Sequence, residues 1–195
     1  MGPEINTGVT AIVPDALSAE RRSIPAGLAV GNGYGKLVGA TQIIELGAIE
    51  TPVLLTSTLS AFRVADALVT EVLAQPWHAN TTTLDPVVGE TNDGFLSHIR
   101  DRPIGPEDVQ YALTAASSGP VAEGNVGAGT GTTALGFKGG ALVPRHGWCW
   151  FVICRSQSEC SYKVTSPGRS ASRGYRFRRA TCCRIHPQRP SETRA

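Results

Sequence analysis

The sequence predicts a layered α+β domain over residues 1–140, followed by a basic tail over residues 141–195. Short β-branched segments and two amphipathic segments mix without the regular alternation of a doubly wound sheet. The chain has 195 residues, of which 41% are hydrophobic, so one domain can bury a sizeable core. Charge and cysteine content also change abruptly near residue 140.

Four segments have the β-branched and apolar composition of strands. Residues 7–13 form the first of them, and Pro14 ends it. The other three strands are expected at residues 28–30, 41–46 and 52–56. Glycine and asparagine over residues 31–36 indicate a turn between the second and third strands.

Two segments are predicted to be helical. Over residues 61–75 most apolar side chains recur at three- and four-residue spacing, as on one face of a helix. The polar residues 80–95 are expected to form a loop. A second helix is predicted over residues 106–118, because Pro106 suits the first turn and Gly119 suits the end.

The glycine-rich residues 124–140 superficially resemble a phosphate-binding loop. A dinucleotide fingerprint requires G-x-G-x-x-G, whereas residues 127–131 read G-x-G-x-G. No acidic residue lies between Glu123 and Glu159 to bind a ribose. We therefore expect no nucleotide cofactor, and we predict that these glycines let backbone segments approach closely.

The tail has its own composition. Residues 1–140 carry seven basic and 14 acidic side chains, whereas residues 141–195 carry 11 basic and two acidic ones and all five cysteines. The cysteine spacing fits no zinc motif, so no metal is expected. A structureless basic tail explains the arginines more simply than nucleic-acid binding does.

The sequence also limits location and chemistry. No run of 18 apolar residues predicts a membrane span, and no secretory signal opens the chain, so we expect a cytoplasmic protein. His78 and His98 have no partner at metal-ligand spacing and are expected on the surface or in loops. Residues 90–94, Glu-Thr-Asn-Asp-Gly, either hold a cation or substrate amine or form a turn.

Seven motifs stand in order along the chain. They are Thr-Gly-Val-Thr-Ala-Ile (7–12), Pro-Ala-Gly (25–27), Asn-Gly-Tyr-Gly-Lys (32–36), Gln-Ile-Ile-Glu-Leu-Gly-Ala-Ile-Glu-Thr-Pro-Val-Leu-Leu-Thr (42–56), Pro-Val-Val-Gly-Glu-Thr-Asn-Asp-Gly (86–94), Gly-Pro-Val-Ala-Glu-Gly-Asn-Val-Gly-Ala-Gly-Thr-Gly-Thr (119–132) and Gly-Phe-Lys-Gly-Gly (136–140). Together they resemble the DmpA family of aminopeptidases, which includes L-aminopeptidase/D-amidase and β-peptidyl aminopeptidase relatives.

The resemblance implies an incomplete αββα sandwich and a self-cleaving hydrolase. Such a precursor cuts itself before a small hydroxyl residue after Lys-Gly-Gly, and the freed residue supplies both nucleophile and amine. The implied substrates are short peptides, amides or esters, with no cofactor and with a homo-oligomer as the family-like assembly. The implied substrate- or oxyanion-binding residues are Tyr34, Asn92 and Asn125.

The chain departs from the family where the nucleophile is expected. Residues 141–147 read Ala-Leu-Val-Pro-Arg-His-Gly instead of a Gly-Ile-Gly-Thr-Ser-Ser-Arg-like segment. Ser57 stands where the family usually has Asn, and Ser97-His98 where it usually has Asn-Asp. We therefore expect this chain to be inactive as a peptidase.

A shifted reading frame would explain the departure. Codons built from the third base of one residue and the first two bases of the next permit Gly-Ile-Gly-Thr-Ser-Ser-Arg-Val-Val-Leu-Val from Gly140 onward. Our hypothesis is a frameshift near codons 139–141, either genuine or a sequencing error. Two other functions stay open: a non-catalytic binding module with a basic tail, and an acyltransferase like the ornithine acetyltransferases.

Overall fold

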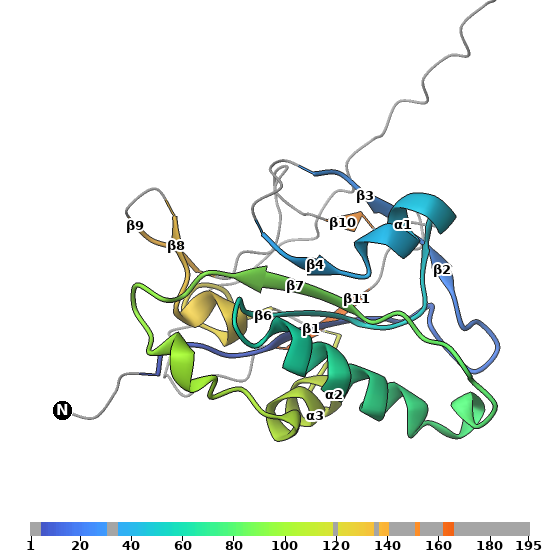
Figure 1. Ribbon diagram of the computed structural model, residues 1–195. Coiled ribbons are helices and arrows are strands. Elements are labelled where there is room, and N and C mark those ends of the chain that lie inside the picture. Colours follow the sequence, from blue (N-terminus) through green and yellow to red (C-terminus); the bar gives the residue numbers. More distant parts are fainter. Residues whose placement is uncertain are drawn as a thin grey trace, which may run out of the picture.

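A five-stranded sheet forms the centre of the computed structural model, in the strand order β11-β1-β6-β7-β4 (Figure 1). The structure describes residues 5–30, 35–118, 121–134, 137–140, 151–152 and 162–165. The strands are β1 (Thr10–Pro14), β4 (Leu37–Val38), β6 (Val53–Ser57), β7 (Val87–Thr91) and β11 (Tyr162–Thr165). Strands β6 and β7 run parallel, and the other neighbours are antiparallel.

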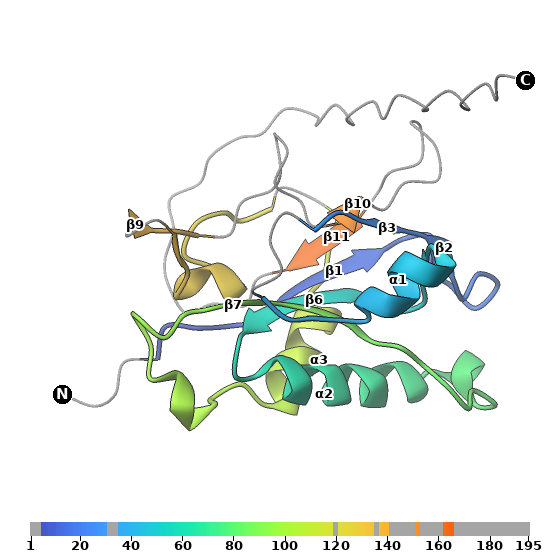
Figure 2. The ribbon, with the colours of Figure 1, turned by 45° about the horizontal axis from the view of Figure 1, so that its top comes forward.

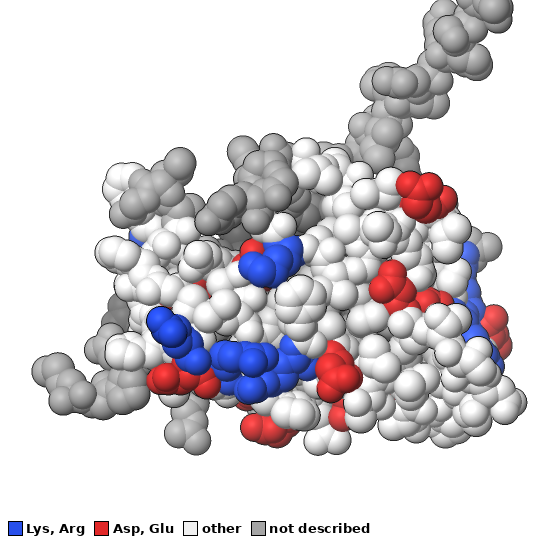
Figure 3. All heavy atoms as spheres, in the orientation of Figure 1, with Lys and Arg blue, Asp and Glu red and all other residues white. Residues whose placement is uncertain are grey.

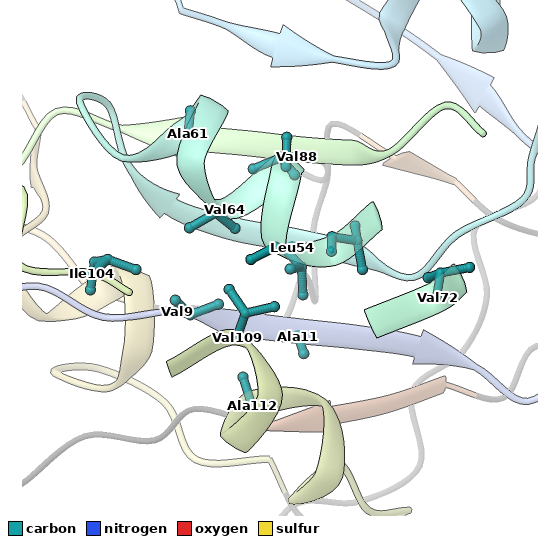
Figure 4. Packing of buried hydrophobic residues seen from close by; sticks show 13 residues of the cluster. Val9, Ala11, Leu54, Ala61, Val64, Val72, Val88, Ile104, Val109 and Ala112 are labelled. Carbon is teal, nitrogen blue, oxygen red and sulfur yellow. The ribbon is translucent and has the colours of Figure 1, made fainter. Parts of the chain in front are cut away.

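Helices α2 (Ala61–Leu73) and α3 (Pro106–Thr114) cover one face of this sheet (Figures 1 and 2). Their apolar sides pack onto side chains of β1, β6 and β7 (Figure 4). The fully buried members of this cluster are Val9, Ala11, Leu54, Ala61, Val64, Leu68, Val88, Val109 and Ala112. Removing this apolar surface from water is the main favourable contribution to the fold.

A smaller layer covers the opposite face. Helix α1 (Ala40–Leu46) and the ladder of β2 (Ile24–Pro25) with β5 (Ala48–Ile49) enclose a second apolar cluster. Its buried members are Ile24, Ile43, Ile49, Val53 and Val87. The remaining short elements are β3 (Gly27–Leu28), η1 (Pro76–His78), η2 (Ile99–Asp101), η3 (Gly127–Thr130), β8 (Thr133–Ala134), β9 (Phe137–Lys138) and β10 (Phe151–Val152). The architecture is α+β, with α2 and α3 as a helical layer on one face of the sheet, as expected for part of a sandwich.

The strand predicted over residues 41–46 is wrong, because these residues form α1. Gly39 and Gly47 bracket the helix with φ values of 84° and 63°, and the Gly47 N–H donates to the Ile43 carbonyl. A glycine in this left-handed conformation is a typical helix end. Thr41, Ile43 and Ile44 suggested a strand by composition, but the bracketing glycines decide the local structure.

The loop predicted over residues 80–95 is also wrong in part, because it contains β7. Gly89 explains the difficulty, because glycine is unusual inside a strand; a Cβ there would lie 2.9 Å from a methyl of Leu55, which would have to shift. His78 is another correction, since it is buried in η1 and its Nδ1 lies 3.0 Å from Thr81 Oγ1. His98 is exposed, as expected.

The remaining helix and strand predictions agree with the structure within a few residues. Helix α3 begins at Pro106, and Asp108 accepts a hydrogen bond of 2.9 Å from Gly105 N. The tail predicted to be structureless differs in part, because residues 151–152 and 162–165 form β10 and β11, which pair with β3 and β1. The prediction that the other tail residues are unstructured concerns residues outside the described ones.

The two-layer core makes a first prediction. Leu54 is fully buried between β6 and the helices, so Leu54→Ala should lower the free energy of unfolding by about 2–5 kcal/mol. Leu46→Ala is the control, because Leu46 is 73% exposed on α1 and should change stability by less than about 0.5 kcal/mol. Urea denaturation of the full chain measures both values, and equal losses would contradict the assigned core.

Two carboxylates meet at the amino ends of β6 and β7. Asp85 N donates to Glu50 Oε1 at 2.9 Å, and Val87 N donates to Thr51 Oγ1 at 3.1 Å. Burial, followed by the negative charge of Glu50, raises the pKa of Asp85 above its usual value of 3.8. The folded state therefore binds the Asp85 proton more tightly than the unfolded state does.

This shift predicts a pH-dependent gain from Asp85→Asn. Because the folded pKa is raised, protonation of Asp85 stabilises the folded state. This contribution to the free energy of unfolding is fully present below pH 3.8 and is lost as pH rises through the folded pKa. The variant should be more stable than the parent by about 0.5 kcal/mol at pH 7 and equal to it below pH 3.8. Urea denaturation at pH 7 and at a pH below 3.8 measures the stability difference. Glu45→Gln is the control, because it makes the same charge change at an exposed position. A gain at low pH alone would contradict the assignment.

Candidate functional site

The candidate site lies where the parallel strands β6 and β7 end together. Their pairing runs from Val53 with Val87 to Ser57 with Thr91, so both strands stop at the same edge. The turn η3 packs against these two strand ends (Figure 1). This edge therefore collects side chains from three separate parts of the chain.

Asp93, just beyond β7, is a fully buried carboxylate. Its Oδ1 accepts a hydrogen bond of 2.7 Å from Ser57 Oγ, at the end of β6. Its Oδ2 is buried and has no hydrogen-bond partner among the described residues. A buried carboxylate oxygen without a donor costs free energy, so this atom is suited to accept a hydrogen bond from a bound amine.

The amino-terminal segment closes one side of this carboxylate. Asn6 N donates to Ser97 Oγ at 3.1 Å, and Asn6 Nδ2 donates to Leu96 O at 2.6 Å. A Cβ on Gly131 would collide with Asn6 O and would lie 2.5 Å from Asp93 Cβ. The glycine is therefore required where these three segments meet.

Hydroxyl groups tie η3 to the sheet. Thr132 Oγ1 donates to Ala128 O at 3.0 Å and lies 3.1 Å from Thr91 Oγ1, so Thr91 is the donor of that second bond. Ala128 N donates to Thr10 Oγ1 at 3.2 Å. A Cβ on Gly8 would lie 2.8 Å from Gly127 O, which confirms that glycines allow close backbone approach in this region.

Lys138 fastens the β8–β9 hairpin to η3. Its Nζ donates to Gly129 O at 3.1 Å and to Gly139 O, and burial lowers the pKa of Lys138. Gly139 N donates to Thr132 O at 2.8 Å. A Cβ on Gly140 would lie 2.7 Å from Gly124 O. Residues 139–140 thus contact Thr132, just after η3, and Gly124, in the turn before η3.

The three residues expected to bind substrate have different outcomes. Asn92 is exposed directly after β7, and its Oδ1 accepts a hydrogen bond of 3.0 Å from Gly94 N, which is the turn geometry proposed for this motif. Asn125 is exposed in the turn before η3 and belongs to the same edge. Tyr34 and the expected nucleophile segment at residues 141–147 lie outside the described residues.

Glu90 belongs to the other face of the sheet, which α2 covers, because it lies two residues after Val88 in β7. Its Oε1 accepts a hydrogen bond of 3.0 Å from Lys36 N and lies 3.7 Å from Lys36 Nζ. Lys36 Nζ also donates to Thr58 Oγ1 at 2.7 Å. The Glu-Thr-Asn-Asp-Gly motif therefore divides between two faces, and Asp93 alone of its acids faces η3.

The face of the molecule drawn in Figure 3 carries side chains of both charge signs, with Lys and Arg side chains lying among Asp and Glu side chains. Among the described residues, no three His, Cys, Asp or Glu side chains gather as metal ligands would. None of the described helices is both long and apolar enough to cross a bilayer.

Solved structures identify the class of this fold. The chain is similar to the PH0078 protein from Pyrococcus horikoshii OT3, with a TM-score of 0.64 and 41% identity over 70% of this chain and 39% of that one. It is also similar to the L-aminopeptidase D-Ala-esterase/amidase from Ochrobactrum anthropi, with a TM-score of 0.61 and 35% identity over 68% and 38% of the chains. That enzyme is described as a prototype of the serine aminopeptidases with a variant of the Ntn hydrolase fold. The chain has the α+β fold of this hydrolase class.

Sequence comparison gives the family. Residues 1–141 match the model of Peptidase family S58, and the chain belongs to this family. Beta-peptidyl aminopeptidase BapA of Sphingosinicella microcystinivorans is 40% identical over 139 residues, covering 71% of this chain and 34% of the relative. BapA of Sphingosinicella xenopeptidilytica is 38% identical over 135 residues, covering 69% and 33%. The chain thus spans about a third of the length of these relatives.

Sequence reasoning did not single out the Ser57–Asp93 pair. Ser57 was noted as a departure from the usual Asn, and Asp93 as one member of a polar motif. Their contact depends on the register of β6 with β7, which no local pattern reveals. Lys138 was noted only as part of the Gly-Phe-Lys-Gly-Gly motif.

The Ser57–Asp93 pair makes a prediction. Ser57→Ala removes the one described donor to a fully buried carboxylate, so the free energy of unfolding should fall by about 1–3 kcal/mol. Ser18→Ala is a matched control, because Ser18 Oγ donates to Glu20 Oε2 at 2.8 Å on the exposed surface. That variant should lose less than about 0.5 kcal/mol. Similar losses in both variants would show that burial of the pair is wrongly assigned.

Proposed function

We propose that this chain supplies the first part of a self-processing peptidase that releases N-terminal residues from short peptides, amides or esters. The position of Gly139 and Gly140 supports this most strongly. Gly139 N donates to Thr132 O and Gly140 lies against Gly124, so Lys-Gly-Gly ends beside the segments that pack on the edge where β6 and β7 end. In the DmpA-type pattern the hydroxyl nucleophile follows Lys-Gly-Gly within a few residues.

The surrounding groups suit that chemistry. The free oxygen of Asp93 can accept a hydrogen bond from an amine, either of the substrate or of the freed nucleophile. Asn92 and Asn125 carry carboxamide donors at the same edge and are proposed to bind the substrate or the oxyanion. Tyr34 is the third candidate, and only the family resemblance supports it.

The names of the relatives support the substrate class. They are called beta-peptidyl aminopeptidases and an L-aminopeptidase D-Ala-esterase/amidase. The chain itself has no serine or threonine from residue 141 to residue 147. We therefore propose that it neither cleaves itself nor turns over substrate, and that residues 141–195 are read out of frame. A cytoplasmic location and homo-oligomeric assembly remain predictions.

Expression of two genes tests the proposal. One encodes the chain as given, and the other restores the alternative frame after codon 140. The restored product should split into two chains on a denaturing gel and should release p-nitroaniline from L-alanine, D-alanine or β-alanine p-nitroanilide. The chain as given should be slower by about 10⁴-fold or more, because the nucleophile is absent. Comparable turnover by both products would contradict the assigned nucleophile segment.

The binding-module alternative has a separate test. It requires nucleic-acid binding that weakens with salt and disappears when residues 141–195 are deleted. No feature of the described residues favours it. Transfer of an acetyl group to ornithine by the restored product would instead favour the acyltransferase alternative.

A further inference from the structure

Three buried polar atoms lack hydrogen-bond partners among the described residues near the start of α2. They are Thr56 Oγ1, Ser60 Oγ and Glu90 Oε2. Thr56 and Ser60 are fully buried, and the Glu90 side chain is only 7% exposed. Buried polar atoms in folded proteins are almost always hydrogen-bonded, so three in one region call for a common explanation.

The sheet register brings two of these atoms together. Thr56 and Glu90 are direct neighbours in the parallel pair β6–β7, whose strands lie about 4.8 Å apart. Each lies two residues after a residue that packs against α2, Leu54 in β6 and Val88 in β7 (Figure 4). Because side chains alternate along a strand, Thr56 and Glu90 also face α2.

The third atom comes from the start of that helix. Thr58 N donates to Thr91 O at 2.9 Å, and Ser60 N donates to Ser57 O at 2.9 Å. These bonds hold the turn from β6 into α2 over the ends of both strands. Ser60 precedes the first residue of α2 but makes no side-chain cap hydrogen bond. Its buried hydroxyl thus has no hydrogen-bond partner among the described residues, at the end of the turn that these backbone bonds hold against β6 and β7.

The charges of the region select a neutral ligand. Glu90 already has a cationic partner, since Lys36 Nζ lies 3.7 Å from Oε1. A second cation would stand beside the positive amino end of α2, which disfavours it. An anion would face the Glu90 carboxylate. The ligand must be neutral and must donate to Oε2 while exchanging hydrogen bonds with two hydroxyls.

We propose that Thr56, Ser60 and Glu90 bind one buried water molecule between α2 and the ends of β6 and β7. Three protein partners are typical for such a water. The water donates to Glu90 Oε2 and exchanges hydrogen bonds with Thr56 and Ser60. It thereby links the Lys36–Glu90 ion pair to the start of α2. This site lies on the helix side of the sheet and does not depend on the proposed peptidase function.

A high-resolution crystal structure of the full chain tests the site directly. We expect a water oxygen within about 3 Å of all three atoms. Direct hydrogen bonds from Thr56 and Ser60 to Glu90 Oε2, with no water between them, would overturn the proposal. A metal ion identified by anomalous scattering at this position would overturn it too.

Variants provide a second readout in solution. Thr56→Val keeps the side-chain shape but removes one partner of the water, and should increase the unfolding equilibrium constant about tenfold. It should also remove the long-lived water signal in water-relaxation NMR. Thr70→Val is the matched control, because Thr70 Oγ1 donates to Asp66 O on the exposed side of α2. A water signal unchanged in Thr56→Val would contradict the site, and if that variant fails to fold, Ser60→Ala serves the same comparison.

Discussion

The parallel pairing of β6 and β7 is the constraint on which the rest of the structure depends. Both strands are buried on two faces and end at the same level. One face of the pair supports α2 and the larger apolar cluster, and the other supports α1 and the smaller cluster. Because the strands stop together, the segments that follow them converge with η3 on one edge. The candidate site and the water site are two faces of that same edge.

The sequence predicts the elements whose patterns are local and misses those that depend on neighbours. Helix α2 has apolar residues at regular helical spacing, and β6 is a compact β-branched run, so both are predictable. Strand β7 is hard to recognise because polar residues flank it and because Gly89, which lies against Leu55 of the neighbouring strand, interrupts its apolar pattern. Helix α1 is short and rich in isoleucine, and only Gly39 and Gly47 mark its ends. Local composition contains no information on such tertiary contacts.

The candidate site was also predictable from the sequence only in part. Motif order along the chain gives Asn92 and Asn125, and the structure puts both at the edge formed by β6, β7 and η3. The burial of Asp93 could not be predicted, because it depends on Asn6 and Gly131 from distant parts of the chain. Carboxylates in polar loops are usually exposed. The family pattern identifies the region, and packing decides which of its acids is withdrawn from water.

The position of β11 at the border of the sheet has a consequence for how the chain assembles during synthesis. Strands β1, β6 and β7 and helices α2 and α3 are all complete by Thr114, so their contacts can form before later residues leave the ribosome. Pairing of Ala11 with Thr165 closes a very long loop, which makes it a slow and late step. Among the described residues after 140, only β11 joins this sheet, and it does so at the border. A change in the residues that form β11 therefore alters the last stage of assembly and leaves the earlier contacts unaltered.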